Sequence, residues 1–342
     1  MNSARHSVVR LSGVGVLLVA ACASMASQPA PQGSGATPLK PIDAILEAFR
    51  DYRLVGIGDA HGNRLGEAFQ QSLIRDSRLP MLVNDIVMES GNSRYQEVAD
   101  RYIRGESVPR DSLQRIWLDT TQQHLASLEI PLVFSAVREV NMSLPPDRRI
   151  RVLLGEPPID WDRMKTKDDL RAWSASPDSS RDGFAADLVR REVLTKNRRG
   201  LLLYGAAHFF RRVVHQSIVT LLEPQIPVFT VWTNAATELA ALQPDVATWP
   251  VPSLARIRGT MLGSTGLATY LGPNAGDVSQ EWLAPMQDQF DAVLYLGPLA
   301  TIRLDRPRPW RCAEPALPER LRRLDLQRAG LAARVRETCI PD

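Results

Sequence analysis

The chain lacks several short motifs that identify common enzyme classes. It has no G-x-S-x-G nucleophile elbow, no H-E-x-x-H zinc motif, no P-loop and no C-x-x-C-H haem attachment. An excess of charge of one sign is also absent, with 41 basic and 38 acidic residues among 342. No basic stripe is interleaved with aromatic residues, so we expect no nucleic-acid partner.

Long apolar runs are missing after the N-terminus, so no later segment is expected to cross a bilayer. The N-terminus itself has Arg5 and Arg10 followed by the short apolar run "VGVLLVAA" and then Val19-Ala20-Ala21-Cys22. This order resembles a bacterial lipobox, in which the cysteine is acylated after cleavage; the alternative is a plain signal peptide. We therefore expect a signal peptide over residues 1–21 and a palmitate-type acyl anchor on Cys22. Localisation would be the cell envelope, outside the cytoplasm.

Cysteine is scarce, and the two that remain after Cys22 are Cys312 and Cys339. An even pair in an exported chain predicts a disulfide, and two unpaired buried thiols are the alternative. Between the anchor and the folded part, residues 22–40 are rich in Pro, Gly, Ser and Ala, which predicts a flexible tether.

From residue 41 to 342 the pattern predicts a single α/β domain. Short apolar runs that are continuous rather than alternating suit parallel strands covered by helices on both faces. The expected strands are 53–58, 85–89, 149–155, 200–205, 227–232 and 291–297. Helical patterns lie between them: one covers 65–73, one covers 95–103 with a capping box from Ser93 to Gln96, and one runs from 213 to 222. Residues 168–187 are polar and predict a loop, and 319–336 predict a C-terminal helix with a solvated arginine face.

Acids and histidines recur at the ends of these strands, where ligands bind in open α/β sheets. Asp59 and His61 follow the first strand, Glu89 the second, Glu156 the third and His208 the fourth. "GDAH" and "GAAH" are two copies of Gly-x-x-His, each directly after an apolar strand. Two imidazoles and one carboxylate form a known catalytic metal set, and the same groups can work without metal, one His as base and Glu89 orienting it.

Other interpretations of these residues stay open. "LVGIGDAHGN" begins like a G-x-G-x-x-G dinucleotide fingerprint, but His61 stands where the third glycine belongs, and the second Gly-x-x-His is left unexplained. The strand-end histidines could instead be hydrogen-bonded core residues. That interpretation is favoured for His124 and His215.

The paired Gly-x-x-His motifs with a glutamate after the second strand resemble a superfamily that contains erythromycin esterases, the Tiki and TraB metal-dependent proteases and ChaN-like haem-binding lipoproteins. The resemblance covers roughly residues 53–232. It implies that His61, Glu89 and His208 form the core of the site, with Asp59 where the ChaN-like proteins and the esterases tend to carry Glu.

Together these observations predict a lipid-anchored extracytoplasmic hydrolase that acts on an ester or peptide bond of a small-molecule or peptide substrate. His61, Glu89 and His208 would bind a divalent metal such as zinc, manganese or cobalt, or act without one, and Asp59 and Glu156 are further catalytic candidates. The alternative is a haem- or iron-binding lipoprotein of ChaN-like type, and the third is a non-catalytic envelope scaffold.

Overall fold

The computed structural model describes residues 33–122, 132–213, 216–272, 284–304, 312 and 315–337. The signal peptide, Cys22, His124, His215 and Cys339 lie outside the described residues, so the expectations placed on them stay predictions. Cys312 is disulfide-bonded. Its expected pairing with Cys339 stays a prediction, because Cys339 lies outside the described residues. No helix in the described ranges is both long enough and apolar enough to span a bilayer.

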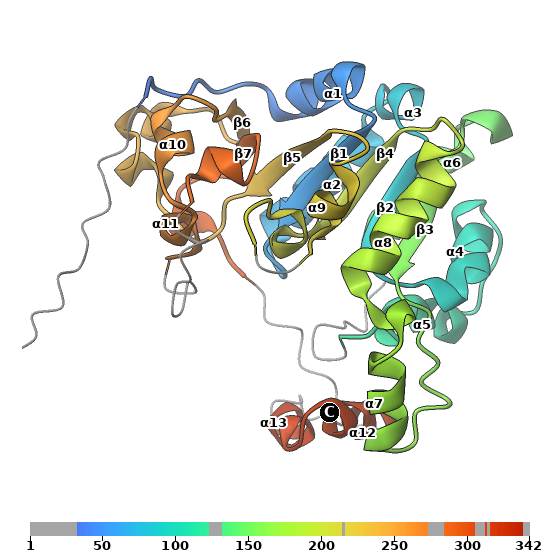
Figure 1. Ribbon diagram of the computed structural model, residues 1–342. Helices are drawn as coiled ribbons and strands as arrows, with labels where there is room; N and C mark the ends of the chain where they lie inside the picture. The colour runs from blue at the N-terminus through green and yellow to red at the C-terminus, as the bar shows by residue number, and fades with distance from the viewer. Residues whose placement is uncertain are drawn as a thin grey trace, which may run out of the picture. The chain divides into compact units, whose positions relative to one another are not determined.

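A mostly parallel sheet confirms the α/β fold class. Within the described residues seven strands run in the order β3-β2-β4-β1-β5-β7-β6, and only β6 is antiparallel to its neighbour. The strands are β1 (Leu54–Asp59), β2 (Asp85–Asn92), β3 (Arg151–Glu156), β4 (Gly200–Gly205), β5 (Val228–Thr233), β6 (Ser253–Arg256) and β7 (Ala292–Tyr295). Strand β1 pairs with β4 and β5, so it lies near the middle of the sheet (Figure 1).

Helices cover both faces of the sheet, as the continuous apolar strands predict. They are α1 (Pro41–Asp51), α2 (Arg64–Arg75), α3 (Leu79–Leu82), α4 (Gln96–Ile103), α5 (Arg110–Leu118), α6 (Leu132–Met142), α7 (Lys167–Ser174), α8 (Arg181–Val189), α9 (Ile218–Leu222), α10 (Met261–Ser264), α11 (Leu267–Leu271), α12 (Leu317–Gln327) and α13 (Leu331–Arg336).

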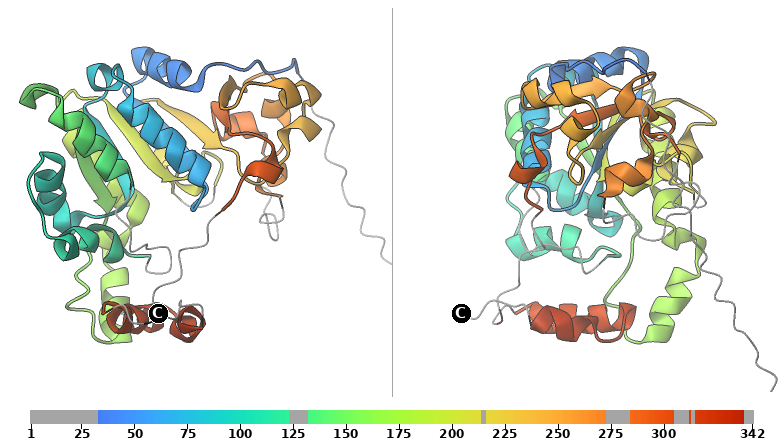
Figure 2. Two further views of the ribbon diagram at one scale, coloured as in Figure 1. Left: turned by 180° about the vertical axis from the view of Figure 1, so that it is seen from behind. Right: turned by 90° about the vertical axis from the view of Figure 1, so that its left-hand side faces the viewer.

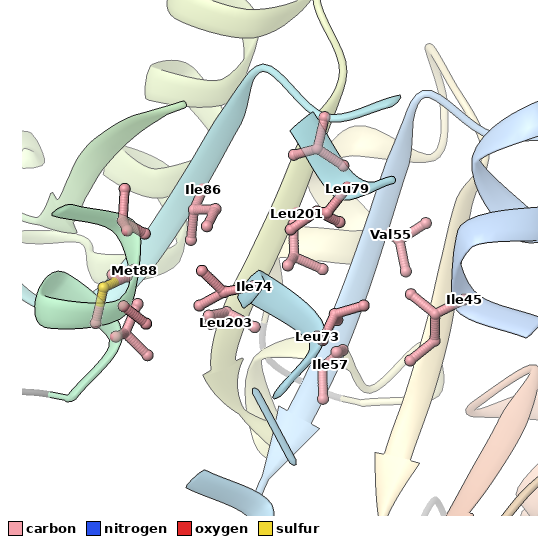
Figure 3. Packing of buried hydrophobic residues seen from close by; sticks show 14 of the residues in the cluster. Ile45, Val55, Ile57, Leu73, Ile74, Leu79, Ile86, Met88, Leu201 and Leu203 are labelled. Atoms are coloured by element: carbon pink, nitrogen blue, oxygen red, sulfur yellow. The ribbon is translucent and has the colours of Figure 1, made fainter. Parts of the chain in front are cut away.

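Alternate residues of each strand face opposite layers. Val55, Ile57, Leu201 and Leu203 belong to one buried cluster with residues of α1 to α6, and Figure 3 shows them against Ile45, Leu73, Ile74 and Leu79. The intervening Leu54, Leu202 and Tyr204 belong to a second cluster with α8 to α11.

All six expected strands are present to within a few residues, and only the short edge strand β6 was not expected. Its four residues, Ser-Leu-Ala-Arg, are too few to show a period.

The prediction of a loop over residues 168–187 is wrong. It contains α7 and α8, because Thr166 and Asp169 form a capping box and the Ser180 side chain accepts from the Gly183 amide. This correction matters for function, because α8 begins with Arg181 and Asp182.

Two further helix predictions need correction. The Ser93 and Gln96 capping box is absent: Asn92 caps this turn by accepting from the Arg94 amide, and the Gln96 side chain bonds to the backbone of β3 instead. The helix expected from 213 begins at Ile218, because Ser217 caps it.

The C-terminal helix is divided into α12 and α13 around Gly330, whose φ of +78° favours glycine. Its arginine face is not fully solvated either. Arg320 and Arg323 are buried.

Candidate functional site

The first Gly-x-x-His turn joins β1 to α2. Strand β1 ends at Asp59, Gly62 turns the chain with a φ of +80°, and the Asn63 side chain caps α2 by accepting from the Gly66 amide. His61 therefore lies on a tight turn between two fixed elements. Its side chain is 44% exposed, which leaves it open to a ligand from solvent.

The second turn follows β4. Strand β4 ends at Gly205, and Ala206–Phe209 form a single 3₁₀ turn that carries His208. The side chain of His208 is only 12% exposed. Because β4 and β1 are parallel neighbours, with Asp59 in register with Gly205, both turns emerge at the same edge of the sheet.

The glycine of each turn makes room for the other turn. A Cβ on Gly205 would lie 2.8 Å from Nε2 of His61, and a Cβ on Gly58 would lie 3.0 Å from the Cα of Ala206. Gly56 is needed for a similar reason, since a Cβ there would lie 2.7 Å from the Phe209 ring. The two glycines at the start of "GIGDAH" thus leave room for the second turn.

Glu89 lies between the two imidazoles and is buried. Its Oε2 accepts from the Gly205 amide at 2.5 Å. Its Oε1 is 3.2 Å from Nε2 of His208 and 3.7 Å from Nε2 of His61. Burial alone would raise the pKa of Glu89, but the hydrogen bond from His208 and the positive charges around it hold that pKa well below its usual range. Glu89 is therefore a fixed anion.

His208 is held between two carboxylates. Its Nδ1 is 2.7 Å from Oδ1 of Asp182, and its Nε2 faces Glu89. Burial lowers the pKa of His208, but the hydrogen bonds to Asp182 and Glu89 outweigh it and raise the pKa to about 9. At neutral pH this ring is an imidazolium, so it is a poor candidate for a base.

Arg181 joins the ends of β2 and β3. Its Nη2 is 2.5 Å from Oε1 of Glu89, and its Nε donates to Oε1 of Glu156. The other oxygen of Glu156 accepts from the amide of Thr121 at 3.2 Å and from the Thr121 hydroxyl. Burial and the charge of Glu89 raise the pKa of Glu156, and Arg181 and Thr121 partly offset this.

Asp59 has the opposite character to Glu89. Burial raises its pKa to about 8, with contributions from the charges of Glu67 and Glu89, so its carboxyl holds a proton at neutral pH. Its Oδ1 is buried and has no hydrogen-bond partner within the structure described. A neutral carboxylic acid can give a proton to a leaving group, and Asp59 stands two residues before His61.

The arrangement does not fit a divalent metal. A metal shared by His61, Glu89 and His208 would have to lie about 2.0–2.1 Å from the ligand nitrogens. The Arg181 guanidinium already neutralises the oxygen of Glu89 that faces both rings. Over the described part of the chain, no group of three or more His, Cys, Asp or Glu side chains is arranged to hold a metal ion.

The structure thus brings together all five strand-end residues that the sequence singles out. Sequence reasoning missed Arg181, Asp182 and Thr121. For the first two a signal existed, because Ser180 followed by Arg-Asp-Gly is a helix start with an acid in the first turn. Thr121 follows α5 with no such signal.

Comparison with known proteins gives structural likeness only. No family model matches the chain, and no curated protein matches it.

Among solved structures, a succinoglycan biosynthesis protein aligns with a TM-score of 0.52 at 11% identity, covering 77% of this chain and 94% of its own. The type III effector HopBA1 aligns with a TM-score of 0.41 at 12% identity, covering 78% of this chain and 98% of its own. ChaN of Campylobacter jejuni, described with cofacially bound haem, aligns with a TM-score of 0.32 at 13% identity, covering 57% of this chain and 86% of its own. The first of these likenesses shows a shared fold and nothing about activity.

Proposed function

We propose that this chain is a hydrolase of the cell envelope that cleaves an ester or peptide bond without a metal. The observation that carries the proposal is Arg181, which supplies a positive charge at Glu89, where a two-histidine, one-glutamate centre would hold its metal. A guanidinium stays protonated at all ordinary pH values, so Arg181 supplies this positive charge permanently.

His61 is the general base in this proposal. It is the more exposed of the two turn histidines, and its Nε2 lies 3.7 Å from Oε1 of Glu89, whose negative charge faces the ring. A water between His61 and the substrate carbonyl would lose its proton to the ring as the oxygen attacks carbon. The bond between that carbon and the leaving oxygen or nitrogen then breaks, and Asp59, neutral at the start, gives its proton to the leaving atom. The proton held by His61 returns to Asp59 and restores the starting state.

His208 and Arg181 contribute fixed positive charge beside the site. Both are held by carboxylates and do not need to reorganise when negative charge develops on the substrate oxygen, which is the property of a preorganised electrostatic site. Their own charges are compensated by Glu89, Glu156 and Asp182, so the net charge of the cluster stays small.

One experiment separates the three candidate functions. Purified protein is treated with EDTA and assayed against p-nitrophenyl esters and fluorogenic peptides, and its absorbance spectrum is recorded. We expect turnover that survives EDTA and a colourless protein. A Soret band on the isolated protein supports the haem-binding alternative, and activity restored only by added zinc, manganese or cobalt contradicts the metal-free proposal. Absence of both turnover and a chromophore favours the non-catalytic scaffold.

The membrane is the other proposed partner, through an acyl group on Cys22. Replacement of Cys22 by Ala should abolish acylation and leave the precursor uncleaved, as seen by a mass that lacks the acyl groups and retains residues 1–21. Normal processing of the variant contradicts the anchor.

A further inference from the structure

Helix α12 contacts residues 119–121, the short segment that follows α5, although it lies far beyond that segment in sequence. It lies beside α7 (Figures 1 and 2). Two of its side chains, Arg323 and Gln327, bond to this segment. They are four residues apart, so they lie on the same face of the helix.

Arg323 holds the start of this segment. Its Nη1 donates to Oδ1 of Asp119, both side chains are less than 10% exposed, and its guanidinium lies 5.5 Å from the centre of the Trp161 ring. The other oxygen of Asp119 accepts from the Tyr95 hydroxyl at 2.7 Å, and the Asp119 carbonyl accepts from Nδ2 of Asn92 at 2.7 Å. Asp119 thus ties α12 to the end of β2, the strand that carries Glu89.

Gln327 holds the end of the segment. Its Nε2 donates to the carbonyl of Thr121. Thr121 in turn gives Glu156 two hydrogen bonds, from its amide and from its hydroxyl. Glu156 then accepts from Arg181, and Arg181 reaches Glu89. An unbroken chain of hydrogen bonds therefore runs from α12 to the carboxylate between the two histidines.

We propose that Gln327 is a positioning residue of the site. Through Thr121 it fixes the carboxylate of Glu156, which fixes the direction of Arg181 and hence the charge at Glu89. Segment 119–121 has no regular secondary structure, and no strand of the sheet pairs with it, so side chains must hold it in place. The contribution to catalysis rests on the proposed function, whereas the positioning itself does not.

The test compares Gln327→Met with a matched control. Methionine keeps the length and shape of glutamine and removes the donor. The control is Gln71→Met on α2. Gln71 makes the same kind of bond, because its Nε2 donates to the backbone carbonyl of Glu67 at 3.3 Å, but it has no hydrogen bond to segment 119–121. Gln327→Lys restores a donor of similar reach and serves as the rescue.

The first measurement needs no substrate. Amide hydrogen exchange at Thr121 and the NMR signal of Arg181 Nε–H are recorded for all four proteins. We expect Gln327→Met to speed exchange at Thr121 by about 3- to 10-fold, the equivalent of one hydrogen bond, and to weaken protection of the Arg181 Nε–H. Gln71→Met should match the parent and Gln327→Lys should recover most of the effect. Unchanged exchange at Thr121 in Gln327→Met, or the same change in the control, overturns the proposal.

The second measurement is hydrolysis of a p-nitrophenyl ester. We expect Gln327→Met to lower kcat about 3- to 10-fold with little change in KM, because Gln327 acts through Thr121 and Glu156 and only the preorganised charges shift. Equal kcat in parent and variant overturns the catalytic part of the proposal. If the parent itself has no turnover with any ester or peptide, the proposed function fails, and the exchange measurement still decides whether Gln327 positions the site.

Discussion

The two Gly-x-x-His turns are nearly identical in sequence and differ in what they can do. His61 is 44% exposed and faces one carboxylate, Glu89, at 3.7 Å. His208 is 12% exposed and lies between Glu89 and Asp182 at 3.2 and 2.7 Å. The first ring is open to solvent, and the second is a buried cation. A repeated motif therefore supplies a reacting group from one copy and a fixed charge from the other.

The difference comes from the chain segments that pack around each turn. After β1 the chain turns outward through Gly62 and begins α2, which leaves His61 at the rim. After β4 the 3₁₀ turn folds back against β1, and α8 brings Asp182 onto the ring. Asymmetry in a repeated motif is thus created by an element that is not part of the repeat.

The largest expected effect comes from replacing each histidine by alanine and measuring both turnover and unfolding. His61→Ala should lower kcat about 10²- to 10⁴-fold, the usual contribution of a general base, and leave the free energy of unfolding within about 0.5 kcal/mol of the parent. His208→Ala should destabilise the fold by on the order of 3 kcal/mol, because it removes a buried cation from two carboxylates. Equal stability losses in the two variants would abolish the distinction between the turns.

Replacing Asp59 should have the next largest effect, and it should stabilise the fold where replacing His208 destabilises it. A carboxyl whose pKa rises from 3.8 to about 8 on folding loses stability as pH increases across that interval. Asp59→Asn removes this cost and should raise the free energy of unfolding at pH 7 by on the order of 2–4 kcal/mol, after discounting for partial exposure. Turnover should fall in the same variant. Urea unfolding of both proteins at pH 4 and pH 7 checks this, because the gain should nearly vanish at the lower pH.

Replacing the glycines of the two turns should have the smallest effects on stability and turnover, and it separates what each glycine does. In Gly205→Ala the new methyl lies against the end of the His61 side chain, which can swing away, so we expect a loss of about 1 kcal/mol and a clear loss of turnover. In Gly58→Ala the methyl lies against the backbone of Ala206, which cannot move easily, so we expect a loss of about 2–3 kcal/mol. Thermal unfolding and ester hydrolysis of the two variants show whether stability and activity change in this order.

Much of this arrangement can be predicted from the sequence. Short apolar runs predict six of the strands, and because the carboxyl ends of parallel strands meet at one edge, the residues after them predict that His61, Glu89 and His208 converge. The unequal roles cannot be predicted in this way, because they depend on Arg181, Asp182 and Thr121. Arg181 and Asp182 lie in a polar segment where composition suggests a loop and only the cap at Ser180 shows the helix. Thr121 is placed by side chains from α12, a contact between distant parts of the chain that no local pattern records.

The difference between the two turns is tested most directly by titrating the histidine rings by NMR, with the His208 signals identified by their absence from a His208→Asn variant. We expect the His208 ring to stay protonated through neutral pH and to titrate near pH 9, since Asp182 and Glu89 hold its proton. The stability that this proton provides should be complete below the unfolded pKa of 6.5 and be lost as pH rises through about 9. A His208 ring that titrates at or below its ordinary value would contradict the account, because the second turn would then hold a neutral imidazole, able to act as a base or to bind a metal.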